Sequence, residues 1–162
     1  MPSTSETIGL VAIMEKQDTG NAWQPHAWRA LACRAARAKD PLGADAASGR
    51  RLIVQGALTL HRSEAENYLF NLSGGSAPAI YVILTKPASA EDVPALVALT
   101  CDPYEAQSFA MANDMIVEAV PMPVEVEAWV EGFVGAHYKE EAFVKRKRKS
   151  HKTGSEDGHG EG

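Results

Sequence analysis

Residues 51–60 read RLIVQGALTL, and this stretch decides the fold that the sequence predicts. The side chains of a β-strand point alternately to its two faces. Apolar side chains occupy one face of this stretch, at Leu52, Val54, Leu58 and Leu60. Polar side chains occupy the other face, so the alternation predicts a strand with one buried side and one solvated side.

Other segments on either side of this stretch are typical of strands, because they are short, apolar and bounded by turn-forming residues. They are residues 8–16, 23–33, 79–85, 95–100 and 115–120.

The stretch between residues 61 and 79 predicts a hairpin. Ser63–Glu66 matches a helix capping box, which predicts a single helical turn. Tyr68–Leu72 then alternates like a strand, and the Ser-Gly-Gly-Ser sequence of residues 73–76 is typical of a turn. We therefore expect residues 68–72 to pair with residues 79–85.

Two segments predict α-helices. Asp102 is suited to cap a helix and Pro103 suits its first position, so a helix is expected near residues 103–112. After Pro123, apolar residues recur at helical spacing, which predicts a long C-terminal helix near residues 124–138. Because a regular strand–helix–strand alternation is absent, the expected fold is α+β with a mainly antiparallel, twisted or barrel-like sheet.

The charge of the chain is unevenly distributed. Its formal net charge is −5, but six Lys or Arg and three Asp or Glu follow Val144, which places +3 there and −8 on residues 1–144. No large apolar residue follows Val144, so burial cannot offset the entropic cost of ordering this segment. We expect a single globular α+β domain over residues 1–144 and a disordered, basic-then-acidic tail over residues 145–162.

The basic run at the start of this tail has two interpretations. It is either a solvated segment that keeps the protein dispersed or a segment that docks on an acidic partner or an anionic surface. Its residues are Lys145, Arg146, Lys147 and Arg148. Nucleic-acid binding is not expected of the acidic body, because phosphate contacts supply most of the non-specific affinity.

Several functional classes lack a sequence signature. No apolar run is long enough to cross a bilayer, and the polar start of the sequence differs from a secretory signal, so we expect a cytoplasmic protein. Cys33 and Cys101 form no CxxC pair and are expected to be buried free thiols. Metal-ligand spacings, dinucleotide loops and hydrolase motifs are absent, so we expect no metal, assign no cofactor and favour a protein that is not an enzyme.

The densest polar cluster begins at the end of the 51–60 strand. Its candidate residues are His61, Arg62, Glu64 and Tyr68. General acid–base catalysis needs such groups within reach of a substrate. A solvated corner in which Arg62 pairs with a carboxylate explains the same residues, and a partner-binding surface is the third interpretation.

A second candidate surface is the start of the 103–112 helix. Glu105 occupies the position that would complete a capping box with Asp102. The structural role of a helix cap explains these residues, and the alternative is that Tyr104 and Glu105 also present a binding surface.

A set of short motifs resembles a known family when taken together. The motifs are Leu60–Glu64, Asn71–Leu72, Tyr81–Leu84, Asp102–Gln107, Val120–Pro123 and Phe143–Arg148. They resemble a bacterial family of unknown function that is found near genes for formate dehydrogenase and its maturation. Some members are labelled molybdopterin-guanine dinucleotide biosynthesis protein A. The resemblance covers most of residues 8–149.

The resemblance implies a setting near formate dehydrogenase, not a reaction. Together with the missing catalytic motifs, it favours a non-catalytic accessory or binding protein that assists assembly or maturation of a molybdenum-dependent formate dehydrogenase. Its partner would be a dehydrogenase subunit or a maturation factor. One alternative is a transferase acting on a nucleotide or molybdopterin derivative, although residues 8–14 read as a strand without a Gly-rich loop. The other alternative is an interaction module recruited through the basic tail.

Overall fold

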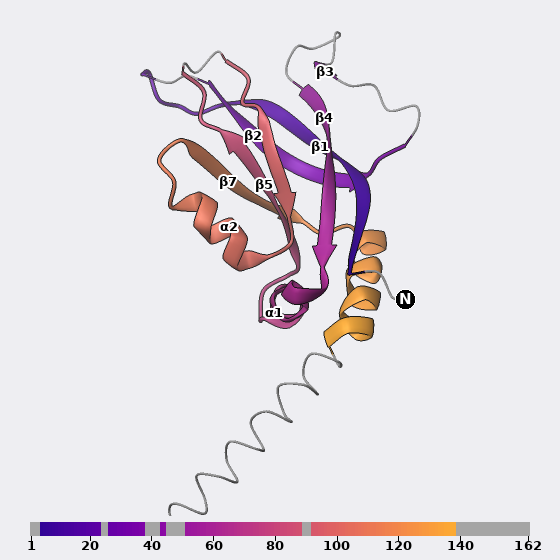
Figure 1. The fold of residues 1–162 in the computed structure, drawn as a ribbon. Helices are drawn as coiled ribbons and strands as arrows, with labels where there is room; N and C mark the ends of the chain where they lie inside the picture. Colours follow the sequence, from indigo (N-terminus) through magenta and orange to yellow (C-terminus); the bar gives the residue numbers. More distant parts are fainter. Residues whose placement is uncertain (1–3, 24–25, 38–42, 45–50, 89–91, 139–162) are drawn as a thin grey trace, which may run out of the picture.

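The computed structural model describes residues 4–23, 26–37, 43–44, 51–88 and 92–138 (Figure 1). Its strands are β1 (Ser5–Asp18), β2 (His26–Ala35), β3 (Gly43–Ala44), β4 (Arg51–His61), β5 (Ala79–Thr85), β6 (Leu96–Thr100) and β7 (Met115–Pro121). Its helices are the 3-10 helix η1 (Arg62–Glu64), α1 (Ala65–Ser73), α2 (Pro103–Ala110) and a helix over residues 124–138, called the C-terminal helix below.

The strands form two antiparallel sheets, with the orders β2-β1-β4-β3 and β6-β5-β7. The first sheet is built around β1, a strand of 14 residues that pairs with β2 on one side and β4 on the other. The second sheet is built around β5, which pairs with β6 and β7. These sheets and the helices confirm the predicted α+β class.

The two sheets approach each other at both pairs of edges, β4 beside β6 and β2 beside β7. We call these two lines the β4/β6 seam and the β2/β7 seam. At the β2/β7 seam, the Glu118 carboxylate of β7 accepts hydrogen bonds from the backbone N–H of Ala30 and from Nε of Arg29, both in β2. The sheets therefore close into a barrel-like arrangement, as the sequence predicts.

The C-terminal helix packs its apolar stripe into the core between the sheets. Its buried core residues are Val126, Val130, Phe133 and Val134. Full burial of a side chain of this size stabilises the fold by roughly 1.5–3 kcal/mol. Nε1 of Trp129 donates a hydrogen bond to the Glu6 carboxylate at 3.1 Å, which places the helix beside the start of β1 (Figure 1).

Both helices that the sequence predicts are present, over residues 103–110 and 124–138. Asp102 caps α2 as expected, because its carboxylate accepts hydrogen bonds from the N–H groups of Tyr104 at 2.9 Å and Glu105 at 3.3 Å. An N-cap carboxylate satisfies N–H groups that have no partner within the first turn.

The predicted hairpin of residues 68–72 and 79–85 is wrong, because residues 65–73 form helix α1. The buried residues of α1 are Ala65, Tyr68 and Asn71, whose spacing of three places them on one side of a helix. The capping box expected at Ser63–Glu66 does not form either, since Glu64 is the N-cap and its side chain makes no capping hydrogen bond. The glycines at 74–75 consequently follow a helix rather than joining two strands.

The predicted tail of residues 145–162 lies outside the described residues. Within the part that the structure describes, no helix combines the length and apolar character needed to cross a membrane. Cys33 and Cys101 are buried free thiols, as predicted. Burial raises the pKa of each thiol to about 12.

Candidate functional site

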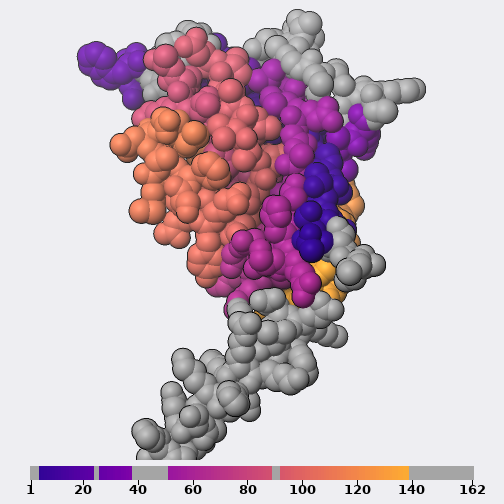
Figure 2. Space-filling view, in the orientation of Figure 1, coloured from indigo at the N-terminus to yellow at the C-terminus, as the bar shows by residue number. Residues whose placement is uncertain are grey.

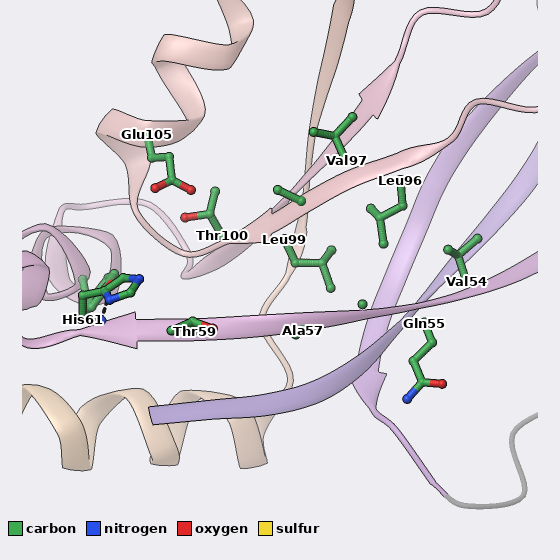
Figure 3. A pocket seen from close by; sticks show the side chains of 13 residues that line it. Val54, Gln55, Ala57, Thr59, His61, Leu96, Val97, Leu99, Thr100 and Glu105 are labelled. Atoms are coloured by element: carbon green, nitrogen blue, oxygen red, sulfur yellow. Dashed lines mark hydrogen bonds between the residues drawn. The ribbon is translucent and has the colours of Figure 1, made fainter. Parts of the chain in front are cut away.

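A groove with a volume of about 500 Å³ runs along the β4/β6 seam (Figure 3). Apolar side chains of both strands line one part of it, among them Val54, Leu96 and Leu99. Polar side chains gather where the two strands end and α1 and α2 begin. These residues are Thr59, His61, Tyr68, Thr100 and Glu105. In Figure 2, the surfaces of β4 and α1, in magenta, lie next to those of β6 and α2, in salmon.

The groove exists because the edges of β4 and β6 belong to different sheets. β4 pairs with β3 only at Leu52 and Ile53, so the rest of that edge has no strand partner in the described part of the chain. A Cβ atom at Gly56 would lie 2.8 Å from Cδ2 of Leu96 and 2.9 Å from Cδ1 of Leu99. The two leucines thus reach across the seam to the glycine, and side chains rather than a β-ladder join the sheets here.

Tyr68 places a hydroxyl group at the polar end of the groove. Its ring is buried and meets Phe133 edge-on, with ring centroids 6.2 Å apart. Its hydroxyl oxygen accepts a hydrogen bond from the backbone N–H of His61 at 2.9 Å. A tyrosine hydroxyl is protonated at neutral pH, and burial raises the pKa of Tyr68 further above its ordinary value, so this O–H is a hydrogen-bond donor at the polar end.

Glu105 reaches the groove because it does not complete the expected capping box. The backbone N–H of Asp102, which a capping box would pair with Glu105, donates instead to the Thr100 hydroxyl at 3.0 Å. The exposed Glu105 side chain points toward the end of β6 (Figure 3). Among the described lining residues it is the one carboxylate, and no Lys or Arg accompanies it, so the polar end carries negative charge.

Two asparagines of α1 hold this helix against the rest of the site. Nδ2 of Asn67 donates hydrogen bonds to the carboxylates of Glu64 at 2.9 Å and Asp102 at 3.1 Å. The buried Asn71 side chain exchanges two hydrogen bonds with the backbone of Ala79, at 2.7 and 3.0 Å. It donates another, at 2.9 Å, to a backbone carbonyl between β6 and α2. Neither asparagine was among the candidate site residues, although Asn67 lies within the polar cluster of residues 61–68 and Asn71 lies in one of the short motifs.

Phe70 of α1 and Tyr104 of α2 form an exposed aromatic pair. Their ring centroids lie 6.0 Å apart, and the side chains are 53% and 55% exposed. A hollow of about 190 Å³, lined in part by Phe70, Tyr81 and Pro103, adjoins the pair. Two large rings from separate helices therefore meet on an exposed part of the surface.

Three of the predicted site residues meet at one place, since His61, Tyr68 and Glu105 all line the polar end of the groove. They come from β4, α1 and α2, and 44 residues of sequence separate the first from the last. Helix α1, which the sequence analysis expected to be a strand, is what carries Tyr68 to this place.

The other predicted residues lie elsewhere. Arg62 lines a second hollow of about 350 Å³, which shares His61 with the groove. The Glu64 carboxylate accepts a hydrogen bond from Asn67, and Tyr104 belongs to the aromatic pair. The basic residues Lys145, Arg146, Lys147 and Arg148 lie outside the described residues.

Metal binding and cysteine reactivity are two further kinds of chemistry for which the described side chains can be examined. In the ranges that the structure describes, no three His, Cys, Asp or Glu side chains form a group able to hold a metal ion. The raised pKa of both cysteines, about 12, keeps them as neutral thiols at physiological pH, and the thiolate is the reactive form. The site is therefore described by hydrogen-bond donors, one carboxylate and apolar side chains.

Residues 9–148 match the model of a protein family described as a protein of unknown function, DUF3305. The match covers most of the chain, so the chain belongs to this family. No curated protein and no solved structure matches the chain. Membership of a family of unknown function agrees with the resemblance predicted from the short motifs, and the formate dehydrogenase setting stays a prediction.

Proposed function

We propose that this protein is a non-catalytic accessory protein that binds a protein partner at the β4/β6 groove and the adjoining aromatic pair. The observation that carries the proposal is the meeting of His61, Tyr68 and Glu105 at one end of a groove of about 500 Å³. Apolar lining with a few convergent polar groups is the usual composition of a binding site. The exposed rings of Phe70 and Tyr104 supply further contact area.

The chemistry of the polar end favours binding over catalysis. A catalytic base needs a pKa near the operating pH, whereas burial raises the pKa of Tyr68 above its ordinary value. Catalytic imidazoles are usually oriented by a hydrogen-bond partner. His61 donates a hydrogen bond to Tyr68 through its backbone N–H, not through its imidazole ring. Among the described residues, no hydrogen-bond partner orients the exposed imidazole.

The partner that we propose is a subunit or maturation factor of a molybdenum-dependent formate dehydrogenase. This part of the proposal comes from the resemblance of the short motifs. Two of those motifs, Leu60–Glu64 and Asp102–Gln107, contain residues that line the polar end of the groove, which supports this end as the surface that the partner recognises.

A complementation experiment tests the proposal. Deleting the gene should abolish formate-dependent reductase activity, and the wild-type gene should restore it. Glu105→Lys reverses the charge of the groove lining, so we expect it to fail to restore activity. Glu125→Lys is the matched control, because Glu125 is also exposed and lies in the first turn of a helix but does not line the groove. Unchanged activity in the deletion strain would refute the formate dehydrogenase setting.

A transferase acting on a nucleotide or molybdopterin derivative is the second candidate. The observation in its favour is the groove volume, which falls in the range of small-molecule sites. Thermal-shift measurements with GTP, molybdopterin nucleotides and Mg²⁺ separate the two candidates, since a ligand that binds only the folded state raises the unfolding midpoint. A rise that Gly56→Val removes would favour the transferase.

A further inference from the structure

We infer that an extended segment of the partner inserts into the β4/β6 seam as an added strand, antiparallel to both β4 and β6. This inference rests on the proposed function, because it specifies how the partner occupies the groove. Strand addition gains affinity from main-chain hydrogen bonds to an unpaired sheet edge and specificity from the side chains that line it.

Strand direction is the first observation that supports an inserted strand. In Figure 3, β4 runs from Val54 toward His61 and β6 runs from Leu96 toward Thr100, so the two strands point to the same end of the groove. Direct pairing of β4 with β6 would therefore be parallel, whereas the strand pairs that the structure describes are antiparallel. A segment that runs the opposite way is antiparallel to both neighbours and continues the pattern of each sheet.

The second observation is that both edges lack the usual protection against pairing. Exposed edge strands are commonly guarded by charged side chains, proline or a covering element. Residues 53–60 of β4 and 96–100 of β6 contain neither a charged residue nor a proline. At the β2/β7 seam, by contrast, the backbone N–H of Ala30 donates a hydrogen bond to the Glu118 carboxylate.

The third observation is that side chains, and no β-ladder between β4 and β6, close the seam in the described part of the chain. Neighbouring strands lie about 4.8 Å apart, so an inserted strand needs about 9.6 Å between β4 and β6. Cα atoms of β4 and β6 now lie within 8 Å of each other, so the two edges must also move apart at this seam. The atoms of Leu96 and Leu99 that approach Gly56 are at the tips of flexible side chains. Turning these tips aside breaks no backbone pairing between β4 and β6, because the two strands belong to separate sheets.

Charge and direction together predict the sequence of the segment. An antiparallel segment enters at the His61 end and leaves at the Val54 end. Glu105 gives the entry end negative charge, so a Lys or Arg near the start of the segment complements it. Alternate apolar residues should follow, because they would meet Leu96 and Leu99 along the apolar part of the groove.

An NMR titration with a defined probe tests the inference. The probe is the acetylated and amidated peptide Thr-Lys-Val-Thr-Val-Thr-Val-Thr, with a nitroxide label at its first residue. We expect the amide signals of residues 54–61 and 96–100 to shift and their hydrogen exchange to slow. The nitroxide should broaden the signals of His61 and Glu105 more than those of Val54 and Leu96.

Two matched peptides and two protein variants sharpen the result. N-methylation at alternate residues removes main-chain donors and should weaken binding about tenfold or more. Replacing the peptide lysine by glutamine should weaken it about threefold, and Glu105→Gln in the protein should remove that difference. Gly56→Val fills the seam and should abolish binding, while Glu125→Gln should leave it unchanged.

Specific outcomes contradict the inference. Broadening at the Val54 end would show that the segment runs parallel to β4 and β6. An effect of N-methylation smaller than twofold, or shifts confined to Phe70 and Tyr104, would show that no strand is added. Strand addition would be refuted if Gly56→Val restored formate-dependent activity and the wild-type protein bound no peptide. The proposed function would then still be tested by whether Glu105→Lys restores that activity.

Discussion

The two seams between the sheets differ in what joins their edges. A buried carboxylate, that of Glu118, links β7 to the backbone of β2 and to Arg29. Uncharged segments of β4 and β6, residues 53–60 and 96–100, face each other at the β4/β6 seam, where leucine tips lie against Gly56 and a groove remains. We take the difference as support for the proposal that a partner binds at the β4/β6 seam, while the contacts of Glu118 join the sheets at the β2/β7 seam. An edge guarded by a charged side chain stays closed, and an unguarded edge is a template for pairing.

Removing the carboxylate of the β2/β7 seam should have the largest effect on stability. Glu118→Ala leaves the half-buried N–H of Ala30 without its acceptor and removes the partner of Arg29, which should lower the free energy of unfolding by about 2–3 kcal/mol. Urea denaturation followed by circular dichroism measures the change. Arg29→Ala is the control and should cost less than about 1 kcal/mol, because the Arg29 side chain is 59% exposed. Equal losses from the two variants would contradict the role given to the backbone contact.

Loosening α1 should have a smaller effect on stability and should act mainly on the β4/β6 seam. Asn71→Ala removes three hydrogen bonds, two to Ala79 and one to the carbonyl of Cys101, and should destabilise the protein by about 2 kcal/mol. Hydrogen exchange should accelerate in α1 and around the polar end of the groove more than in β2 and β7. Ser73→Ala, which removes one exposed side-chain hydrogen bond to the helix backbone, is the control. Uniform acceleration across both sheets would argue against a local role.

The sequence predicted the elements that can be recognised from a local pattern of residues. Alternation identified β4, the Asp102-Pro103 cap identified α2, and helical spacing identified the C-terminal helix. α1 was missed because Tyr68, Phe70 and Leu72 alternate like strand residues, while the polar Asn71 occupies a buried position of the helix. The signal that could have identified the helix is the spacing of three between Ala65, Tyr68 and Asn71.

The groove could be predicted only in part. His61, Tyr68 and Glu105 stood out as polar residues near element boundaries, and the structure brings them together. Thr100, Leu96 and Leu99 could not be connected with them, because the approach of β4 to β6 depends on how two separate sheets close. Contacts of that kind depend on the whole fold and leave no local pattern in the sequence.

The two cysteines offer a smaller comparison between the seams. Cys33 lies in β2, and Cys101 directly follows β6. Burial raises the pKa of both thiols to about 12, so at pH 8 labelling by N-ethylmaleimide requires a local opening. If the β4/β6 seam opens more readily, Cys101 should react about tenfold faster than Cys33, as mass spectrometry of the labelled peptides would show. Faster labelling of Cys33 would show that the β2/β7 seam opens more readily than the β4/β6 seam, which would contradict the prediction.

Site-specific photo-crosslinking in the native host tests the central claim, partner binding at the β4/β6 seam, most directly. A photoreactive phenylalanine derivative placed at Ala57, an exposed residue of the groove lining, should form an adduct with a formate dehydrogenase subunit or maturation factor. The adduct should map to an extended segment that carries a Lys or Arg near its start, and Glu105→Lys should reduce its yield. The same group at Glu131, exposed on the C-terminal helix, should give no such adduct. Equal adducts at Ala57 and Glu131, or an adduct at Glu131 alone, would contradict the account.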